Sequence, residues 1–208
     1  MQINRRTLLA AGAGLVSGAS LPAWAQLRIE ITGVGANQMP IAIPQFQGTN
    51  NAPLDLSTVV TADLERSGSF RALKVRGELP AEDIEKPRAK FWRTMGATAL
   101  VMGTIEKLPD TRYRVNYRLF GTVEDKVIDE KQFVVSSGDL RLTAHRIADA
   151  VYERLTGESG IFASRLAYVL QRGPASYELV VSDSDGANPQ TALKSNQSII
   201  SPMWSPNG

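Results

Sequence analysis

The side chains that could support hydrolysis are one histidine and a carboxylate one helical turn beyond it. His145 is the chain's only histidine, and Asp149 follows it within a segment of helical spacing. A serine–histidine–aspartate site would also need an activated serine, but the chain has no G-x-S-x-G sequence. We therefore expect His145 to lie on the helix surface and to pair with Asp149. No catalytic residue is predicted.

The residue types give little support for a metal centre. The chain has no cysteine, and one histidine alone does not supply the ligands of a usual zinc site. The run Asp183-Ser184-Asp185-Gly186 begins like a calcium loop, yet the later ligands and the distal glutamate are missing. We interpret it as a hairpin turn with Gly186 at positive φ. No metal and no cofactor is predicted.

One face of a predicted strand carries three arginines. Arg112, Arg114 and Arg118 alternate with apolar residues and so share this face. They could contact acidic lipid or an acidic partner. The alternative, which we favour, is a solvated strand face that is balanced by the acids Glu124, Asp129 and Glu130.

The N-terminal residues 1–25 have the order of a secretory signal peptide. Arg5-Arg6 precedes an apolar run from Leu8 to Leu21, and Pro22-Ala23-Trp24-Ala25 supplies an A-x-A cleavage site before Gln26. The run is too short to span a bilayer. Export through either the general secretory route or the twin-arginine route is consistent with these residues. We expect a periplasmic protein with no transmembrane span.

The charge balance shows no excess of basic residues of the kind that nucleic-acid-binding proteins carry. The chain has 23 Lys and Arg against 21 Asp and Glu. The two excess arginines, Arg5 and Arg6, both lie in the predicted signal peptide, so the mature chain is neutral. Neutrality gives no support for nucleic acid as a partner.

Residues 26–160 are predicted to form one mixed α/β domain. A strand is expected at 27–31, a short buried strand at 40–44, a helix from 56 that is capped by Asp55 or Ser57, and a strand at 70–75. Residues 77–87 are expected to be an acidic loop. A short helix at 88–95 should have Pro87 in its first position. Strands at 98–108 and 112–122 should form a hairpin, followed by a strand at 131–136 and a long amphipathic helix at 140–155 that stops at Gly157.

From Arg165 the pattern changes to short strands that are separated by turns. Strands are expected at 166–170, 177–181 and 190–195, and residues 199–204 should begin another. This spacing is typical of a β-propeller blade. We expect residues 161–208 to be the first blade of a truncated six-bladed propeller.

The ordered motifs of the chain resemble the TolB family of the Tol–Pal envelope system. They include Pro40-Ile41-Ala42-Ile43, Val60-Thr61-Ala62-Asp63-Leu64, Ser67-Gly68-Ser69-Phe70, Leu155-Thr156-Gly157, Tyr177-Glu178-Leu179-Val180-Val181 and the terminal Ser201-Pro202-Met203-Trp204-Ser205-Pro206-Asn207-Gly208. The resemblance covers the chain from Gln26 onward almost continuously. The terminal motif is common to many propellers, but the ordered set is specific.

The resemblance implies a binding protein that links TolA of the inner membrane to the lipoprotein Pal of the outer membrane, in envelope constriction at cell division. It places TolA binding on a segment that either docks on the protein itself or is captured by TolA. The resemblance implies that the binding residues in this chain are Gln26, Leu27, Arg28, Ile29, Glu30, Ile31, Thr32, Gly33 and Val34. A β-prone segment beside a chain end could add to a partner's sheet edge. From the residues alone, a fixed edge strand is equally consistent.

Two other functions remain open. The chain could be the N-terminal part of a propeller-bearing serine peptidase, or a generic propeller scaffold. The family's Pal site lies mainly on the propeller, most of which this chain is expected to lack. We expect a monomer without enzymatic activity.

Overall fold

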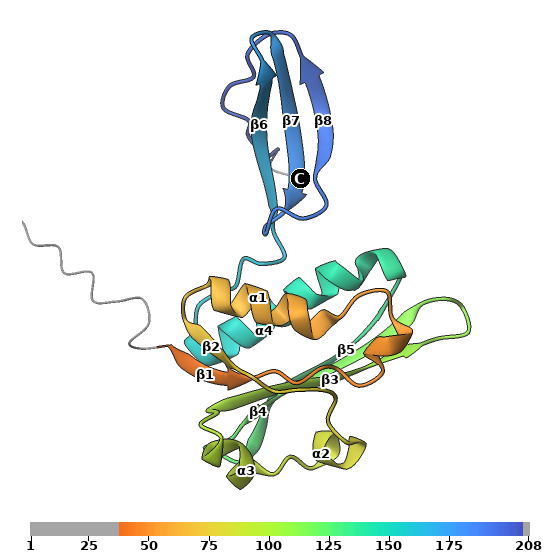
Figure 1. Ribbon diagram of the computed structural model, residues 1–208, viewed down its shortest axis with the longest axis vertical. Coiled ribbons are helices and arrows are strands. Elements are labelled where there is room, and N and C mark those ends of the chain that lie inside the picture. The colour runs from red at the N-terminus through yellow and green to blue at the C-terminus, as the bar shows by residue number, and fades with distance from the viewer. Residues whose placement is uncertain (1–37, 206–208) are drawn as a thin grey trace, which may run out of the picture. The chain divides into compact units, whose positions relative to one another are not determined.

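The mixed domain consists of one five-stranded sheet with helices on both faces (Figure 1). The structure is a computed structural model, and it describes residues 38–205. The strands of this sheet are β1 (Met39–Ala42), β2 (Phe70–Leu73), β3 (Ala99–Lys107), β4 (Tyr113–Gly121) and β5 (Lys126–Val135). They are ordered β2-β1-β3-β4-β5. β1 pairs in parallel with β2 and β3, whereas β3, β4 and β5 pair antiparallel. The sheet is therefore mixed, as expected.

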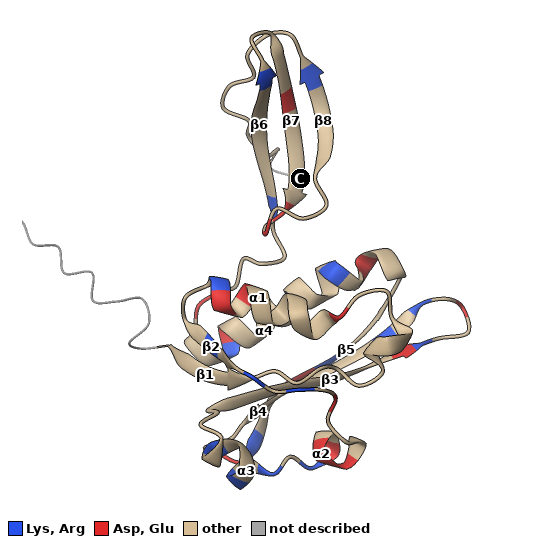
Figure 2. Cartoon of the chain, viewed as in Figure 1, with Lys and Arg blue, Asp and Glu red and all other residues tan. Residues whose placement is uncertain are grey.

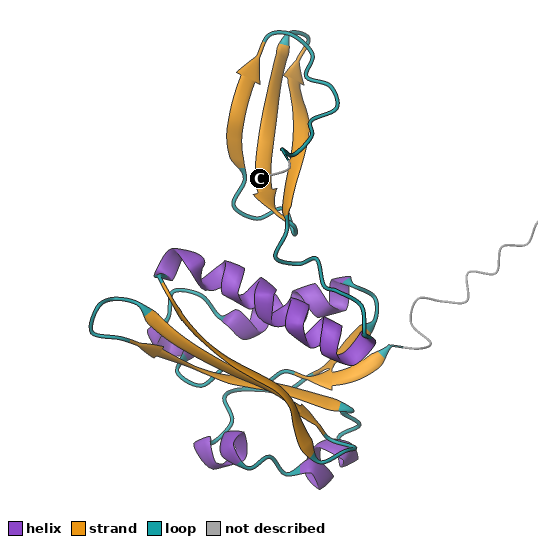
Figure 3. Ribbon diagram, turned by 180° about the vertical axis from the view of Figure 1, so that it is seen from behind, coloured by secondary structure: helices purple, strands orange, loops and turns teal. Residues whose placement is uncertain are grey.

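Two long helices cover one face of this sheet (Figure 3). α1 (Leu56–Arg66) begins at Asp55, whose side chain accepts a hydrogen bond from Ser57 N at 3.0 Å. α4 (Leu140–Thr156) ends at Gly157, which adopts a left-handed conformation with φ 80°. The apolar stripe of α4 is fully buried, and it consists of Leu140, Ala144, Ile147, Ala148 and Val151. Both predicted caps are confirmed, because they follow from local chain geometry.

The opposite face of the sheet carries two short helices, α2 (Ala81–Glu85) and α3 (Ala89–Thr94) (Figure 1). Trp92 of α3 packs there in a second apolar cluster with Leu100, Met102 and Phe120. The expected loop at 77–87 therefore contains a helical turn. Pro87 precedes Arg88, the N-cap of α3, so it does not occupy the first helical position.

A separate three-stranded antiparallel sheet follows in the chain. Its strands are β6 (Arg165–Gly173), β7 (Ser176–Asp183) and β8 (Gln190–Ser195), in the order β6-β7-β8. The three strands expected between 166 and 195 are confirmed. Residues 199–204 form no strand, contrary to the expectation. β5 begins at Lys126, five residues before the predicted start, because it pairs with β4 along nearly its whole length.

Candidate functional site

The expected partner segment, residues 26–34, lies outside the described residues. It is joined by a few residues to β1, where the described chain enters the fold. Met39 N donates a hydrogen bond to Ser69 O at 2.8 Å, and β1 has a neighbouring strand on each side. In the sequence, the segment therefore precedes an interior strand of the sheet.

The arginine face on β4 is held by ion pairs within the domain. Arg112 pairs with Asp110 at 2.6 Å, Arg114 pairs with Glu106 at 2.6 Å, and Arg118 pairs with Glu130 at 2.9 Å. The hydrogen bonds from Arg112 lower the pKa of Asp110. Figure 2 shows acidic and basic residues interspersed along the ribbon of this domain. The charge-balanced interpretation of this face is supported.

Two of the three expected balancing acids are not partners of these arginines. Asp129 lies 3.8 Å from Lys131 Nζ and 3.6 Å from Arg154 Nη2. Glu124 forms no ion pair with another residue of the described range 38–205. The prediction was wrong because other acids lie closer to two of the arginines. Asp110 lies in the turn just before Arg112, and the β3–β4 register places Glu106 opposite Arg114.

Arg118 also fixes a groove between α2 and the sheet. Its Nη1 donates hydrogen bonds to Ile84 O at 3.0 Å and to Glu85 O at 3.3 Å. The groove has a volume of about 570 Å³ and is lined by residues that include Met102, Thr104 and Asn116. The guanidinium thus serves a structural role at the end of α2.

His145 is buried, which overturns the expectation of a surface histidine. It is 1% exposed, and its Nδ1 lies 2.5 Å from Asp63 Oδ2 on α1. Asp149, the predicted partner, instead accepts hydrogen bonds from Phe162 N at 2.6 Å and Ala163 N at 3.0 Å. The expectation failed because α4 packs its His145 side against α1, so the residue has a tertiary partner rather than one from its own helix.

Asp63 is a functional candidate that was not predicted from the sequence. It is fully buried, and its other carboxylate oxygen accepts a hydrogen bond from Arg66 Nη1 at 2.9 Å. A signal for it existed, because Asp63 lies in the apolar stripe of α1 beside Val59, Val60 and Leu64. Burial of a charged side chain in such a stripe requires a partner.

The predicted turn at Asp183-Ser184-Asp185-Gly186 is confirmed. Gly186 has φ 82°, and its N–H donates to Asp183 O at 2.9 Å. The Ala187 N–H donates to Asp185 Oδ1 at 3.0 Å. The two carboxylates are therefore presented side by side by the turn.

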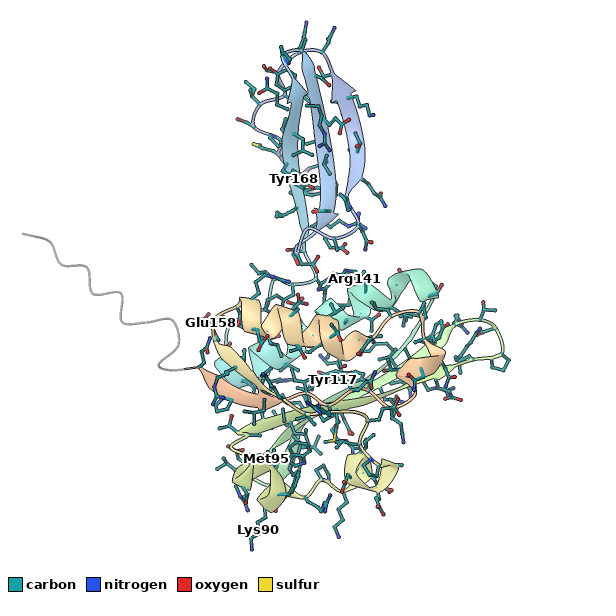
Figure 4. The ribbon with its side chains drawn as sticks, viewed as in Figure 1. Lys90, Met95, Tyr117, Arg141, Glu158 and Tyr168 are labelled. Carbon is teal, nitrogen blue, oxygen red and sulfur yellow. The ribbon has the colours of Figure 1, made fainter. Side chains whose placement is uncertain are left out.

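Arg141 is the second candidate that was passed over; it lies on α4, one turn before His145 (Figure 4). Its Nη2 donates to Asp185 Oδ2, and its Nε lies 3.3 Å from Asp183 Oδ2. Burial acts to raise the pKa of Asp185, but the Ala187 N–H and the Arg141 guanidinium outweigh it, so the pKa is lowered. Asp63, His145, Arg141, Asp183 and Asp185 together form a cluster that we call the His145 network.

Two family models match most of the chain. Residues 27–128 match the TolB amino-terminal domain, and residues 152–208 match the TolB beta propeller domain. The chain belongs to the TolB family. The three-stranded sheet β6-β7-β8 is accordingly part of a propeller blade.

Curated TolB relatives match the chain almost from end to end. The Tol-Pal system protein TolB of Polaromonas sp. (strain JS666) is 46% identical over 99% of this chain and 47% of its own length. That of Bordetella pertussis is 46% identical over 90% of this chain and 42% of its own length. The chain therefore spans about half the length of these relatives.

A solved structure of the family supports the fold. The crystal structure of TolB from Acinetobacter baumannii matches with a TM-score of 0.71 and 33% identity, over 82% of this chain and 42% of the other. Within residues 38–205, no helix is both long enough and apolar enough to cross a membrane.

Proposed function

We propose that this chain is a non-enzymatic periplasmic component of the Tol–Pal system, which binds TolA through residues 26–34. The observation that carries the proposal is its 46% identity to relatives named Tol-Pal system protein TolB. Binding would link the inner-membrane TolA to Pal at the outer membrane during envelope constriction. The propeller would supply the Pal contact.

The proposed mechanism is competitive docking of a β-prone segment. Leu27, Ile29 and Ile31 alternate with polar residues, so their side chains share one face of an extended chain. Backbone groups of such a segment can pair with a sheet edge, while alternate side chains fill apolar pockets. The same segment would dock either on its own protein or on TolA. The position of β1 supports this mechanism. β1 pairs with β2 and β3 from Met39 onward, so displacement of the residues before Met39 would leave these pairs intact.

A double substitution tests this mechanism. Ile29→Asp with Ile31→Asp should weaken binding to the TolA C-terminal domain by more than about a hundredfold, because it places two charges in apolar pockets. The matched control is Val123→Asp, which changes an apolar residue that is 63% exposed at the β4–β5 turn. Circular dichroism should show an unchanged fold for both variants. TolA binding that survives the double substitution would refute the proposed mechanism.

A further inference from the structure

Three potential metal-binding side chains converge between α4 and the turn after β7. A ring nitrogen of His145 and carboxylate oxygens of Asp183 and Asp185 all lie within 4.8 Å of one another. The side chains of Asp183 and Asp185 are 26% and 8% exposed. Imidazole and carboxylate are both ligands that suit zinc.

An independent observation at His145 points to a missing ligand. Its Nε2 is buried and has no hydrogen-bond partner in the described structure. Its Nδ1 is already occupied by Asp63 Oδ2 at 2.5 Å. Leaving a buried polar nitrogen unpaired is costly, so such an atom calls for an explanation.

The contact with Asp63 prepares the imidazole for metal binding. The Asp63 carboxylate accepts a hydrogen bond from the Nδ1–H of the neutral ring, which leaves the lone pair on Nε2. Metal-ligating histidines usually have such a partner on the other ring nitrogen. Arg66 in turn holds Asp63 Oδ1 at 2.9 Å, so the carboxylate is fixed from both sides.

We propose that His145 Nε2, Asp183 and Asp185 bind a Zn²⁺ ion, with water as a fourth ligand. Zinc ligands lie at about 2.0–2.2 Å from the ion and therefore about 3.4 Å from one another in a tetrahedron. The bound ion would connect α4 of the mixed domain to the turn that follows β7.

Arg141 competes with the ion for the same carboxylates. Its guanidinium contacts both Asp183 and Asp185, and a cation there disfavours a second one. Each carboxylate nevertheless has two oxygens, and together these offer about four acceptor positions. Removal of the Arg141 charge should therefore tighten zinc binding.

Calorimetric titration of the untagged, metal-free protein with ZnCl₂ tests the proposal. We expect one saturable site per chain. The sole imidazole should show a shift of its Nε2 resonance in nitrogen-15 spectra on zinc addition. His145→Gln should abolish binding, Asp63→Asn should weaken it by about 10–100-fold, and Arg141→Gln should strengthen it.

The control variant is Asp110→Asn, which removes an exposed acid remote in sequence from the site and should leave the zinc affinity unchanged. The absence of saturable binding by the unsubstituted protein would overturn the proposal. Equal binding by a folded His145→Gln variant would do the same. Should that variant fail to fold, the imidazole spectrum of the unsubstituted protein decides. An unshifted Nε2 resonance at zinc saturation refutes the site.

Discussion

At the residue scale, one buried phenol is held in its neutral form by its surroundings. Tyr117 on β4 is 2% exposed, and its hydroxyl donates to Asp129 Oδ2 on β5 (Figure 4). Burial raises the pKa of Tyr117 well above its ordinary value, and the hydrogen bond to the negative Asp129 raises it further. A phenolate there would lose the hydrogen bond and face a carboxylate.

This contact predicts a loss of stability in alkali. Because the folded pKa exceeds the unfolded one, the native state holds the proton more tightly. The contribution to the free energy of unfolding is complete below pH ~10 and declines as the pH rises above that value. Urea unfolding from pH 8 to 11 should show this decline, and Tyr117→Phe should reduce it. An equal decline in Tyr117→Phe would contradict the assignment.

Residue-level contacts across the tertiary structure were the part that the sequence predicted least well. The i, i+4 spacing suggested His145–Asp149, but the structure pairs His145 with Asp63, 82 residues away. The i, i+4 spacing identifies neighbours within one helix, but it does not identify residues of another helix that packs against it. By contrast, the turn at Gly186 was predictable, because its geometry depends only on adjacent residues.

At the element scale, β3 needs a glycine at position 103, because its backbone there lies close to the ring of Phe46. A Cβ at Gly103 would lie 2.5 Å from Asn116 O and 2.6 Å from Phe46 Cε2. Phe46 is fully buried in the main core, so its ring has little room to move. The strand can pack here only without a side chain.

Gly103→Ala should therefore lower the free energy of unfolding by about 1–3 kcal/mol through overpacking. Gly173→Ala is the matched control, since no atom lies within 4 Å of the added Cβ. It should change the stability by no more than about 0.5 kcal/mol. Chemical denaturation measures both. Equal stability of the two variants would show that β3 tolerates a side chain at this crossing.

Elements with a long apolar period were predictable, whereas short ones were not. α1 and α4 repeat apolar residues over several turns, β3 opens with a continuous apolar run, and β4 alternates apolar and polar residues from Tyr113 to Leu119. α2 has five residues and none of them is buried, so it has no apolar stripe to detect. It forms because Pro80 O accepts hydrogen bonds from Asp83 N and Ile84 N, and Arg118 holds its far end.

At the scale of the whole molecule, the two sheets differ in how many apolar side chains each one buries. The five-stranded sheet has apolar clusters on both faces. Among the strands β6, β7 and β8, Val180 is the one buried hydrophobic residue, and Leu166 and Leu193 are 41% and 52% exposed. The sheet β6-β7-β8 therefore buries less apolar surface than the five-stranded sheet does.

Hydrogen exchange should therefore be faster in the blade. Amides of β7, the central strand of its sheet, should exchange at least tenfold faster than amides of β4, since local opening exposes little apolar surface. Native-state exchange followed by mass spectrometry measures both strands in one sample. Equal protection of β4 and β7 would show that the blade is as cooperative as the mixed domain.

One comparison tests most directly whether residues 26–34 bind TolA. Titration calorimetry with the TolA C-terminal domain should compare the chain that starts at Gln26 with a version that starts at Gln38. We predict 1:1 binding by the first and none by the second, with both versions folded. Equal binding by the two versions, or no binding by either, would contradict the claim.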